Sequence, residues 1–314
     1  MGYAGRSIYF RPMPTNPGAA ARRLDAVAVD AALARMAKQA VPPWLHGEVA
    51  RRMAERLALI RQQPARIVEW WAFLGASAGL LRKAYPKASR VMVEPTPRLA
   101  ERSREMHRPG WWSPRRITSD HVSVCAQEQV DVAGADLLWA NMMLHAVDDP
   151  PALMSRWQQA LDTQGFVMFS CFGPDTLREL RDLYARLGWG APMAPFVDMH
   201  DLGDMLVHAG FADPVMDQET LTLHWPDASS LLRELRSLGG NVASERFAGW
   251  RTPRWRKKLE RELGLLAQRD GRLAMRFEIV YGHAFKAPTR APSQETTVPL
   301  DEMRTLVRSR RNGP

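Results

Sequence analysis

The fold of this chain is decided by the stretch Ala135-Asp-Leu-Leu-Trp-Ala-Asn-Met-Met-Leu-His-Ala-Val-Asp-Asp149 and by Leu161-Asp-Thr-Gln-Gly-Phe-Val-Met-Phe-Ser170, which follows it. The first stretch begins with a short apolar run from Ala135 to Ala140. A second run starts at Phe166 and continues past the quoted stretch to Phe172, and a helical segment near Leu153 separates the two runs. Continuous apolar runs of this length are typical of strands that are buried on both faces of a parallel sheet. We therefore expect two neighbouring parallel strands here.

The same pattern extends to both sides of this stretch. Upstream, two further apolar runs alternate with helical segments near Leu80 and Leu99, namely Ile67 to Trp71 and Val91 to Glu94. Downstream, two late strands are expected, one through Leu221 to Trp225 and one from Leu273 to Phe285. This alternation predicts an α/β fold with a mostly parallel sheet covered by helices on both faces.

The remaining segments suggest how the chain is organised. Residues 1–19 carry prolines and glycines and are expected to be a flexible leader, while residues 287–314 are expected to be a disordered tail. Residues 20–286 would form one domain, opened by two amphipathic helices within 20–62. An insertion at about 227–270 is helical in pattern and predicts a lid over the carboxyl ends of the strands.

Composition excludes several classes of protein. With 314 residues and 46% hydrophobic residues the chain can bury a large core, so a disordered or fibrous protein is excluded. Its apolar runs are shorter than the ~20 residues that span a bilayer, and the start lacks a signal-peptide pattern. We therefore expect a cytoplasmic protein without membrane contact. Two cysteines exclude a disulfide framework and a cysteine-rich metal site.

The charge balance points to an anionic partner. The chain has 43 Lys and Arg against 34 Asp and Glu, a formal net charge of +9. Within the expected lid, the segment Arg251 to Arg261 holds six basic residues and one acid, with Trp250 and Trp255 interleaved. An acidic carrier protein or RNA would suit such a surface, and a solvated basic face is the simpler alternative.

Several motifs indicate a family. The strands around residues 135–170 resemble the fourth and fifth strands of class I S-adenosylmethionine-dependent methyltransferases. Three motifs narrow the resemblance to the malonyl-acyl-carrier-protein O-methyltransferases of biotin synthesis: Phe172-Gly-Pro-Asp-Thr-Leu-Arg-Glu-Leu180, Phe196-Val-Asp-Met-His-Asp-Leu-Gly-Asp204 and Ala209-Gly-Phe-Ala-Asp-Pro-Val-Met-Asp217. The resemblance implies a Rossmann-like sheet of seven strands, with an antiparallel late strand and a helical lid before the last strand.

The turn after the first strand departs from that family. There the family pattern resembles Asp-x-Gly-x-Gly-x-Gly, so Glu69 matches the acid and Gly75 the last glycine, while Trp71 and Phe73 occupy the first two glycine positions. A side chain at a position that favours close approach or positive φ should either move the turn or fill the methionine pocket. The motif is therefore degenerate at the place where S-adenosylmethionine would bind.

The resemblance also implies roles for other residues. Glu94 would accept hydrogen bonds from the cofactor ribose, and Asn141, after the fourth strand, would line the cofactor site together with Glu69 and Gly75. The acid expected near the adenine falls close to Cys125, where only Asp120 is available. The family's Gln-Trp pair is His145-Ala146 here, and Asp30 alone remains of an early Tyr-Asp pair.

The chemistry implied by the family is methyl transfer to the free carboxylate of a malonyl thioester on an acidic carrier protein. A carboxylate is ionised at pH 7, so no general base is needed and orientation and desolvation would carry catalysis. His145 and His283 are candidate substrate contacts, and burial in the core is the alternative for each. His200, Asp201 and Asp204 are interpreted as a polar helix face, so we expect no metal site.

Two other functions remain open at this level. The lost glycines allow a catalytically impaired relative that keeps the fold as a binding or regulatory module. The basic surface allows nucleic-acid binding, which we consider the weaker interpretation because no recognition motif accompanies the charge.

Overall fold

The computed structural model describes residues 24–107, 122–127, 133–247 and 249–288. The expected leader at 1–19, Asp120 and all but the first two residues of the expected tail lie outside these ranges. None of the helices in the described ranges combines the length and the apolar character that a membrane crossing requires.

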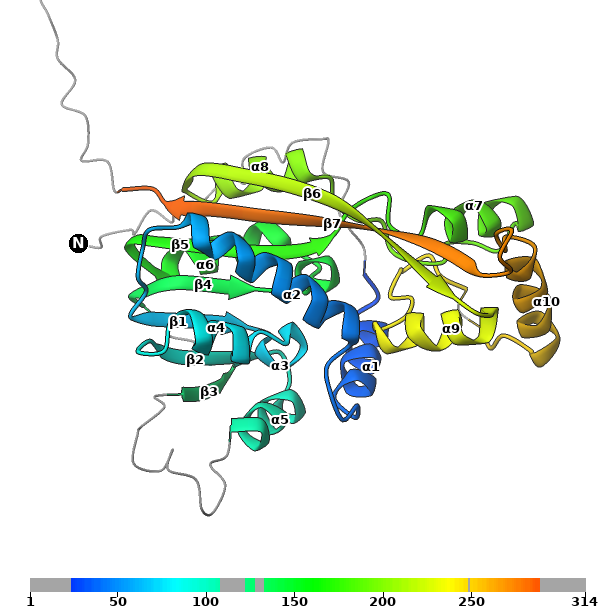
Figure 1. Ribbon diagram of the computed structural model, residues 1–314, viewed down its shortest axis with the longest axis horizontal. Coiled ribbons are helices and arrows are strands. Elements are labelled where there is room, and N and C mark those ends of the chain that lie inside the picture. Colours follow the sequence, from blue (N-terminus) through cyan, green and yellow to red (C-terminus); the bar gives the residue numbers. More distant parts are fainter. Residues whose placement is uncertain (1–23, 108–121, 128–132, 248, 289–314) are drawn as a thin grey trace, which may run out of the picture.

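The described strands form a single seven-stranded sheet (Figure 1) in the order β3-β2-β1-β4-β5-β7-β6. The strands β1 to β5 run parallel, and β7 is antiparallel to both of its neighbours. The chain builds outward from β1 to β3 and then starts again at β4 on the other side, so the topological switch point lies between β1 and β4. The strand bounds are Arg66–Trp70 (β1), Ser89–Glu94 (β2), Val122–Ala126 (β3), Ala135–Ala140 (β4), Leu161–Phe172 (β5), Phe211–Trp225 (β6) and Leu273–Lys286 (β7).

Helices cover both faces of the sheet. One face packs against α2 and α4 and the other against α5, α6 and α8, which divides the core into two apolar clusters. On the α6 side, the Trp157 ring lies 6.2 Å from Trp70 and 6.1 Å from Phe169. The helix bounds are Ala26–Met36 (α1), Trp44–Arg56 (α2), Ala72–Gly75 (α3), Ala78–Ala84 (α4), Pro97–His107 (α5), Pro150–Ala160 (α6), Arg178–Leu187 (α7), Met199–His208 (α8), Ala228–Ser237 (α9) and Pro253–Gly264 (α10).

The predicted helical insertion before the last strand is present as α9 and α10. The long β6–β7 pair extends beyond the other strands and carries these helices past the carboxyl ends of β1, β4 and β5 (Figure 1). The helix α1 joins the same end of the molecule, because Asp25 forms a 2.6 Å ion pair with Arg246 and Leu24 bridges to Ala243. Segments about 200 residues apart in the sequence thus meet above the strand ends.

The pairing of β5 with β7 depends on close contact at Gly282. A Cβ atom at this position would lie 2.3 Å from ring atoms of the fully buried Phe169. We predict that Gly282→Ala lowers the free energy of unfolding by about 1–3 kcal/mol, the usual cost of overpacking a core. Gly79→Ala in α4 is the matched control, because its Cβ would meet nothing within 4 Å. Urea unfolding of the parent and of both variants tests this. A Gly282→Ala variant as stable as the parent would contradict the packing described here.

Candidate functional site

The turn after β1 keeps an unusual backbone conformation. Trp71 has φ 55° and Ala76 has φ 54°, the left-handed region that glycine enters without strain. The four-residue helix α3 lies between them, and the side chains of Trp71 and Phe73 are only 5% and 2% exposed. Both aromatic rings are therefore packed into the protein beside a left-handed turn.

Glu94 ends β2 beneath this turn and is completely buried. Its Oε1 accepts hydrogen bonds from the Phe73 amide at 2.7 Å and from the Ser103 hydroxyl at 2.5 Å. Burial raises the pKa of Glu94 to about 8, so the carboxyl group is mostly protonated at neutral pH. A group in this state offers no exposed carboxylate to a ribose.

Two other predicted cofactor residues, Glu69 and Asn141, also interact with other residues of the chain. Glu69 is buried 3.4 Å from the Arg90 guanidinium, and burial raises its pKa to about 7 although Arg90 opposes the shift. Asn141 donates through Nδ2 to the carbonyls of His46 and Gly75, each at 2.8 Å, and accepts from the Ser170 hydroxyl. These residues lie near one another at the ends of β1 and β4, where they hold α2 and α3 against the sheet.

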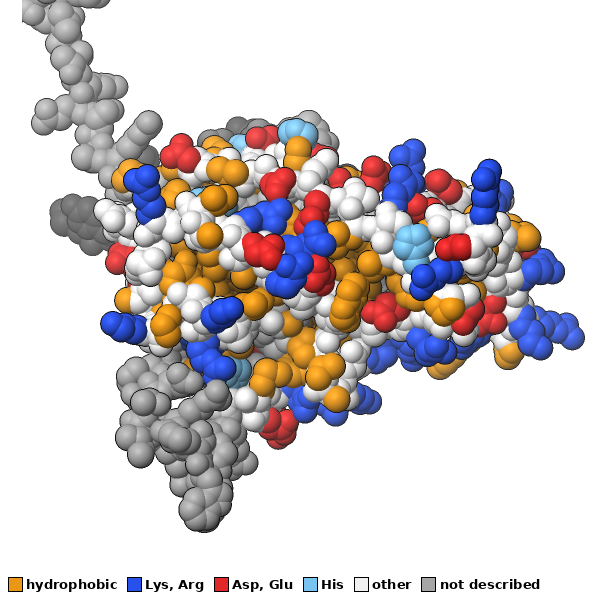
Figure 2. Space-filling model, viewed as in Figure 1, with side chains coloured by type: hydrophobic (Ala, Val, Ile, Leu, Met, Phe, Trp, Pro, Cys, Tyr) orange, Lys and Arg blue, Asp and Glu red, His pale blue; other side chains and the backbone are white. Residues whose placement is uncertain are grey.

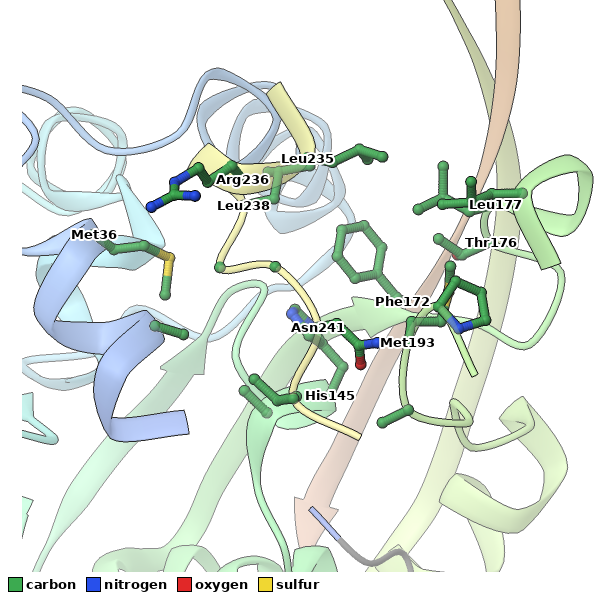
Figure 3. Close-up of a pocket in the computed structure, with 18 of the residues that line it drawn as sticks. Met36, His145, Phe172, Thr176, Leu177, Met193, Leu235, Arg236, Leu238 and Asn241 are labelled. Carbon is green, nitrogen blue, oxygen red and sulfur yellow. The ribbon is translucent and has the colours of Figure 1, made fainter. Parts of the chain in front are cut away.

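A cavity of about 600 Å³ opens beside this turn, between the strand ends and α1, α7, α9 and α10 (Figure 3). Its walls are mostly apolar, and polar atoms enter from a few side chains such as Thr176, Asn241 and His145. The position over the carboxyl ends of parallel strands is the usual ligand site of open α/β sheets. Apolar wall residues include Met36, Phe172, Leu177, Met193 and Phe277.

The structure separates the two candidate histidines. His145 lines the cavity, with its ring 4.5 Å from that of Phe172. His283 lies opposite Met168 in the middle of the sheet and packs between Phe166 and Phe285; burial lowers its pKa. His283 is thus half-buried between two aromatic rings and is not part of the cavity lining, and its role as a substrate contact stays a prediction.

The polar face of α8 has no metal-site geometry. His200 is exposed and shares a 2.7 Å contact with Asp198, the N-cap of the helix. Across the described ranges, no group of three or more His, Cys, Asp or Glu side chains is arranged to hold a metal ion.

Two cavity residues were not identified from the sequence. His46 is buried and donates from Nδ1 to the Leu74 carbonyl at 2.8 Å; burial lowers its pKa to about 4, so the ring is neutral. Its Nε2 has no hydrogen-bond partner among the described residues. The available signal was the position of His46 on the same helix face as Val49 and Met53, both core residues.

Arg35, the second of these residues, faces the cavity from α1. One nitrogen of its guanidinium donates to the Gly239 carbonyl at 2.5 Å, while its buried Nε has no partner in the described part of the chain. Burial and the nearby Arg236 guanidinium both lower the pKa of Arg35. No carboxylate of the described residues lies within 4.0 Å of either arginine. Two adjacent cations without a counter-ion favour binding of an anion.

Comparison with known proteins identifies the family. A methyltransferase domain model matches residues 44–213. Over 274 residues the chain is 35% identical to the malonyl-[acyl-carrier protein] O-methyltransferase of Laribacter hongkongensis, covering 86% of this chain and 90% of the relative. The chain belongs to the malonyl-[acyl-carrier protein] O-methyltransferase family. A second member, from Gallionella capsiferriformans, is 36% identical over 251 residues and covers 78% of this chain and 85% of its own length.

Solved structures support the fold of this methyltransferase. The YcgJ protein of Bacillus subtilis superposes with a TM-score of 0.52 at 10% identity, over 76% of this chain and 98% of its own. Together with the family match, this confirms the predictions of a class I methyltransferase fold and of an S-adenosylmethionine-dependent enzyme.

The resemblance places the cofactor ribose at Glu94, and the side chains of Trp71, Phe73 and Glu94 are all buried there. The rings of Trp71 and Phe73 occupy the space beside the turn, and the Glu94 carboxyl group has no exposed surface. The residues present therefore do not fit an adenosyl group unless side chains move.

The raised pKa of Glu94 makes the stability of the protein depend on pH. Between the ordinary value of 4.5 and about 8, the folded chain holds a proton that the unfolded chain has released. The free energy of unfolding should therefore fall as pH rises, by up to ~1.4 kcal/mol per pH unit for this group. Glu94→Gln keeps the acceptor oxygen and cannot ionise, so we predict a flatter dependence.

Urea unfolding at pH 5, 6, 7 and 8 measures this difference. Glu101→Gln, at an exposed position of α5, is the control and should keep the pH dependence of the parent. Parallel curves for Glu94→Gln and the parent would contradict the buried, protonated state of Glu94.

Proposed function

We propose that this chain transfers the methyl group of S-adenosylmethionine to the free carboxylate of a malonyl thioester on an acyl-carrier protein, in biotin synthesis. The names of its relatives state O-methylation of malonyl-[acyl-carrier protein], and the resemblance implies the methyl donor and the pathway. The observation that carries the proposal is the apolar cavity at the strand ends, with the Arg35 and Arg236 pair at its wall.

The chain's own residues supply binding and desolvation. The malonyl carboxylate is ionised at neutral pH and needs no base, so its positioning is the main task. Arg35 and Arg236 would hold this carboxylate, and apolar walls such as Phe172 and Met193 would exclude water from it. His145 and the neutral His46, which line the cavity, would contact the rest of the acyl thioester.

The carrier protein would dock on α10. Arg251, Trp255 and Leu259 line the cavity from this segment, while Arg254 and Lys257 are exposed on its outer side. Figure 2 shows basic side chains gathered at the end of the molecule that α10 forms. An acidic carrier bound there would place its thioester arm beside the cavity, and the positive charge would speed the encounter.

The arginine pair gives a direct test of substrate binding. We predict that Arg35→Met, which keeps an apolar stem, weakens binding of malonyl-pantetheine by about 10- to 100-fold, the scale of one charged hydrogen bond. Binding of the neutral methyl ester should change little, because it has no carboxylate. Calorimetry without cofactor measures both, with Lys38→Met at an exposed position as control. Equal losses for the two ligands, or none, would remove Arg35 from the site.

The docking surface is tested by reversing its charge. Replacing Arg254, Lys257 and Lys258 with glutamate should slow association with malonyl-carrier protein and flatten its salt dependence, by removing electrostatic steering. Binding of malonyl-pantetheine should stay unchanged, because it needs no docking. Stopped-flow measurements of the association rate constant at several salt concentrations test both effects. Equal rates for variant and parent would reject docking on α10, and tighter binding of RNA than of carrier would favour a nucleic-acid partner.

A further inference from the structure

A hydrogen bond crosses the carboxyl end of β2. Trp71 Nε1 donates to Gln127 Oε1 at 2.9 Å, joining the residue that follows β1 to the residue that follows β3. In the sheet, β2 lies between these strands, and its last residue, Glu94, pairs in register with Ala126. The Trp71 indole therefore spans the carboxyl end of β2 above Glu94, which we call the nucleoside strip.

This bridge is held in place from both ends. The Trp71 amide donates to the Val93 carbonyl at 2.7 Å, and the Arg156 guanidinium donates to the Gln127 carbonyl at 2.7 Å. Indole is a fused bicyclic ring of about the size of adenine, and here it is almost fully buried, with Trp71 lining the acyl cavity together with Leu33 and Met36 of α1.

Beneath the indole, two further groups hydrogen-bond to Glu94. The Phe73 amide and the Ser103 hydroxyl take up Oε1 of that carboxyl group. The Arg102 guanidinium lies 5.1 Å from the centre of the Phe73 ring and donates to the carbonyls of Gln39 and Ala40. The segment before α2 is thereby fastened over the same strip.

We propose that the Trp71 indole is an internal plug in the nucleoside half of the cofactor cleft, and that Gln127 is its latch. An adenosyl group enters only after the indole has left, whereas the acyl cavity accepts its ligand with the plug in place. The proposal concerns the cofactor end of the site and rests on the proposed function.

The left-handed backbone conformation of Trp71 affects the free energy needed to move the indole away from Glu94. A non-glycine residue in this region is strained, so packing of the indole holds the turn against its backbone preference. Removal of the side chain at this position relieves that strain and empties the strip at once. Glycine is therefore the informative replacement.

The test is binding of S-adenosylhomocysteine to the full chain, measured by calorimetry. Trp71→Gly should bind at least 10-fold more tightly than the parent, and Gln127→Ala, which keeps the indole and removes its latch, should lie in between. Trp44→Gly, at a residue 59% exposed at the start of α2, should bind like the parent. Equal affinity of Trp71→Gly and parent would overturn the plug.

A second readout does not depend on the glycine variant folding. The chain contains 11 tryptophans, and in protein labelled with 5-fluorotryptophan the Trp71 ¹⁹F resonance is assigned by its loss in Trp71→Phe. Saturation of the parent with S-adenosylhomocysteine should shift this resonance to an exposed position, while malonyl-pantetheine alone should leave it in place. A Trp71 resonance that stays unmoved when the cofactor product is bound would overturn the proposal.

These measurements separate the plug from the proposed function. If variants bind S-adenosylhomocysteine tightly yet transfer no methyl group to malonyl-carrier protein, the proposed function fails while the plug stands. If the parent binds the cofactor product with its indole in place and methylates the thioester, the plug fails and the proposed function stands.

Discussion

The contact between the Trp71 indole and Gln127 determines how the carboxyl end of the sheet is used. It joins the strand ends on either side of β2 and covers Glu94, whose Oε1 accepts from the Phe73 amide and Ser103 while its buried Oε2 has no partner among the described residues. The protein surrounds this carboxyl group with its own groups, and burial raises its pKa to about 8.

The acyl cavity shares a wall with that contact, because Trp71 also lines it. Its other walls come from α1, α7, α9 and α10, and its charge comes from Arg35 and Arg236. The chain therefore combines an open cavity at the strand ends with a buried Glu94 beside it.

Much of the fold could be predicted from the sequence, because apolar runs and helical periodicity are local signals. The strands around residues 135–172 and the insertion before β7 were located in this way, whereas the departures at Trp71 and Phe73 came from the resemblance to the family motif. The side-chain partners were not accessible. Gln127 meets Trp71 only through the strand order, a non-local property.

The same reason explains why Arg35 was missed and why the sequence did not separate His283 from His145. Arg35 reaches the cavity because α1 packs against a segment some 200 residues later in the chain. His283 has the same residue type as His145 and a similar strand context, but its register opposite Met168 leaves it half-buried between Phe166 and Phe285, outside the cavity lining. Register and long-range packing decide these cases, and no local pattern reports them.

The most direct test of this account is a crystal structure of the unaltered chain with both malonyl-pantetheine and S-adenosylhomocysteine. The account predicts an acyl group in the cavity with its carboxylate on Arg35, and an adenosyl group only where the Trp71 indole has turned away from Gln127. An adenosyl group bound over Glu94 while the bond between Trp71 and Gln127 remains intact would contradict it.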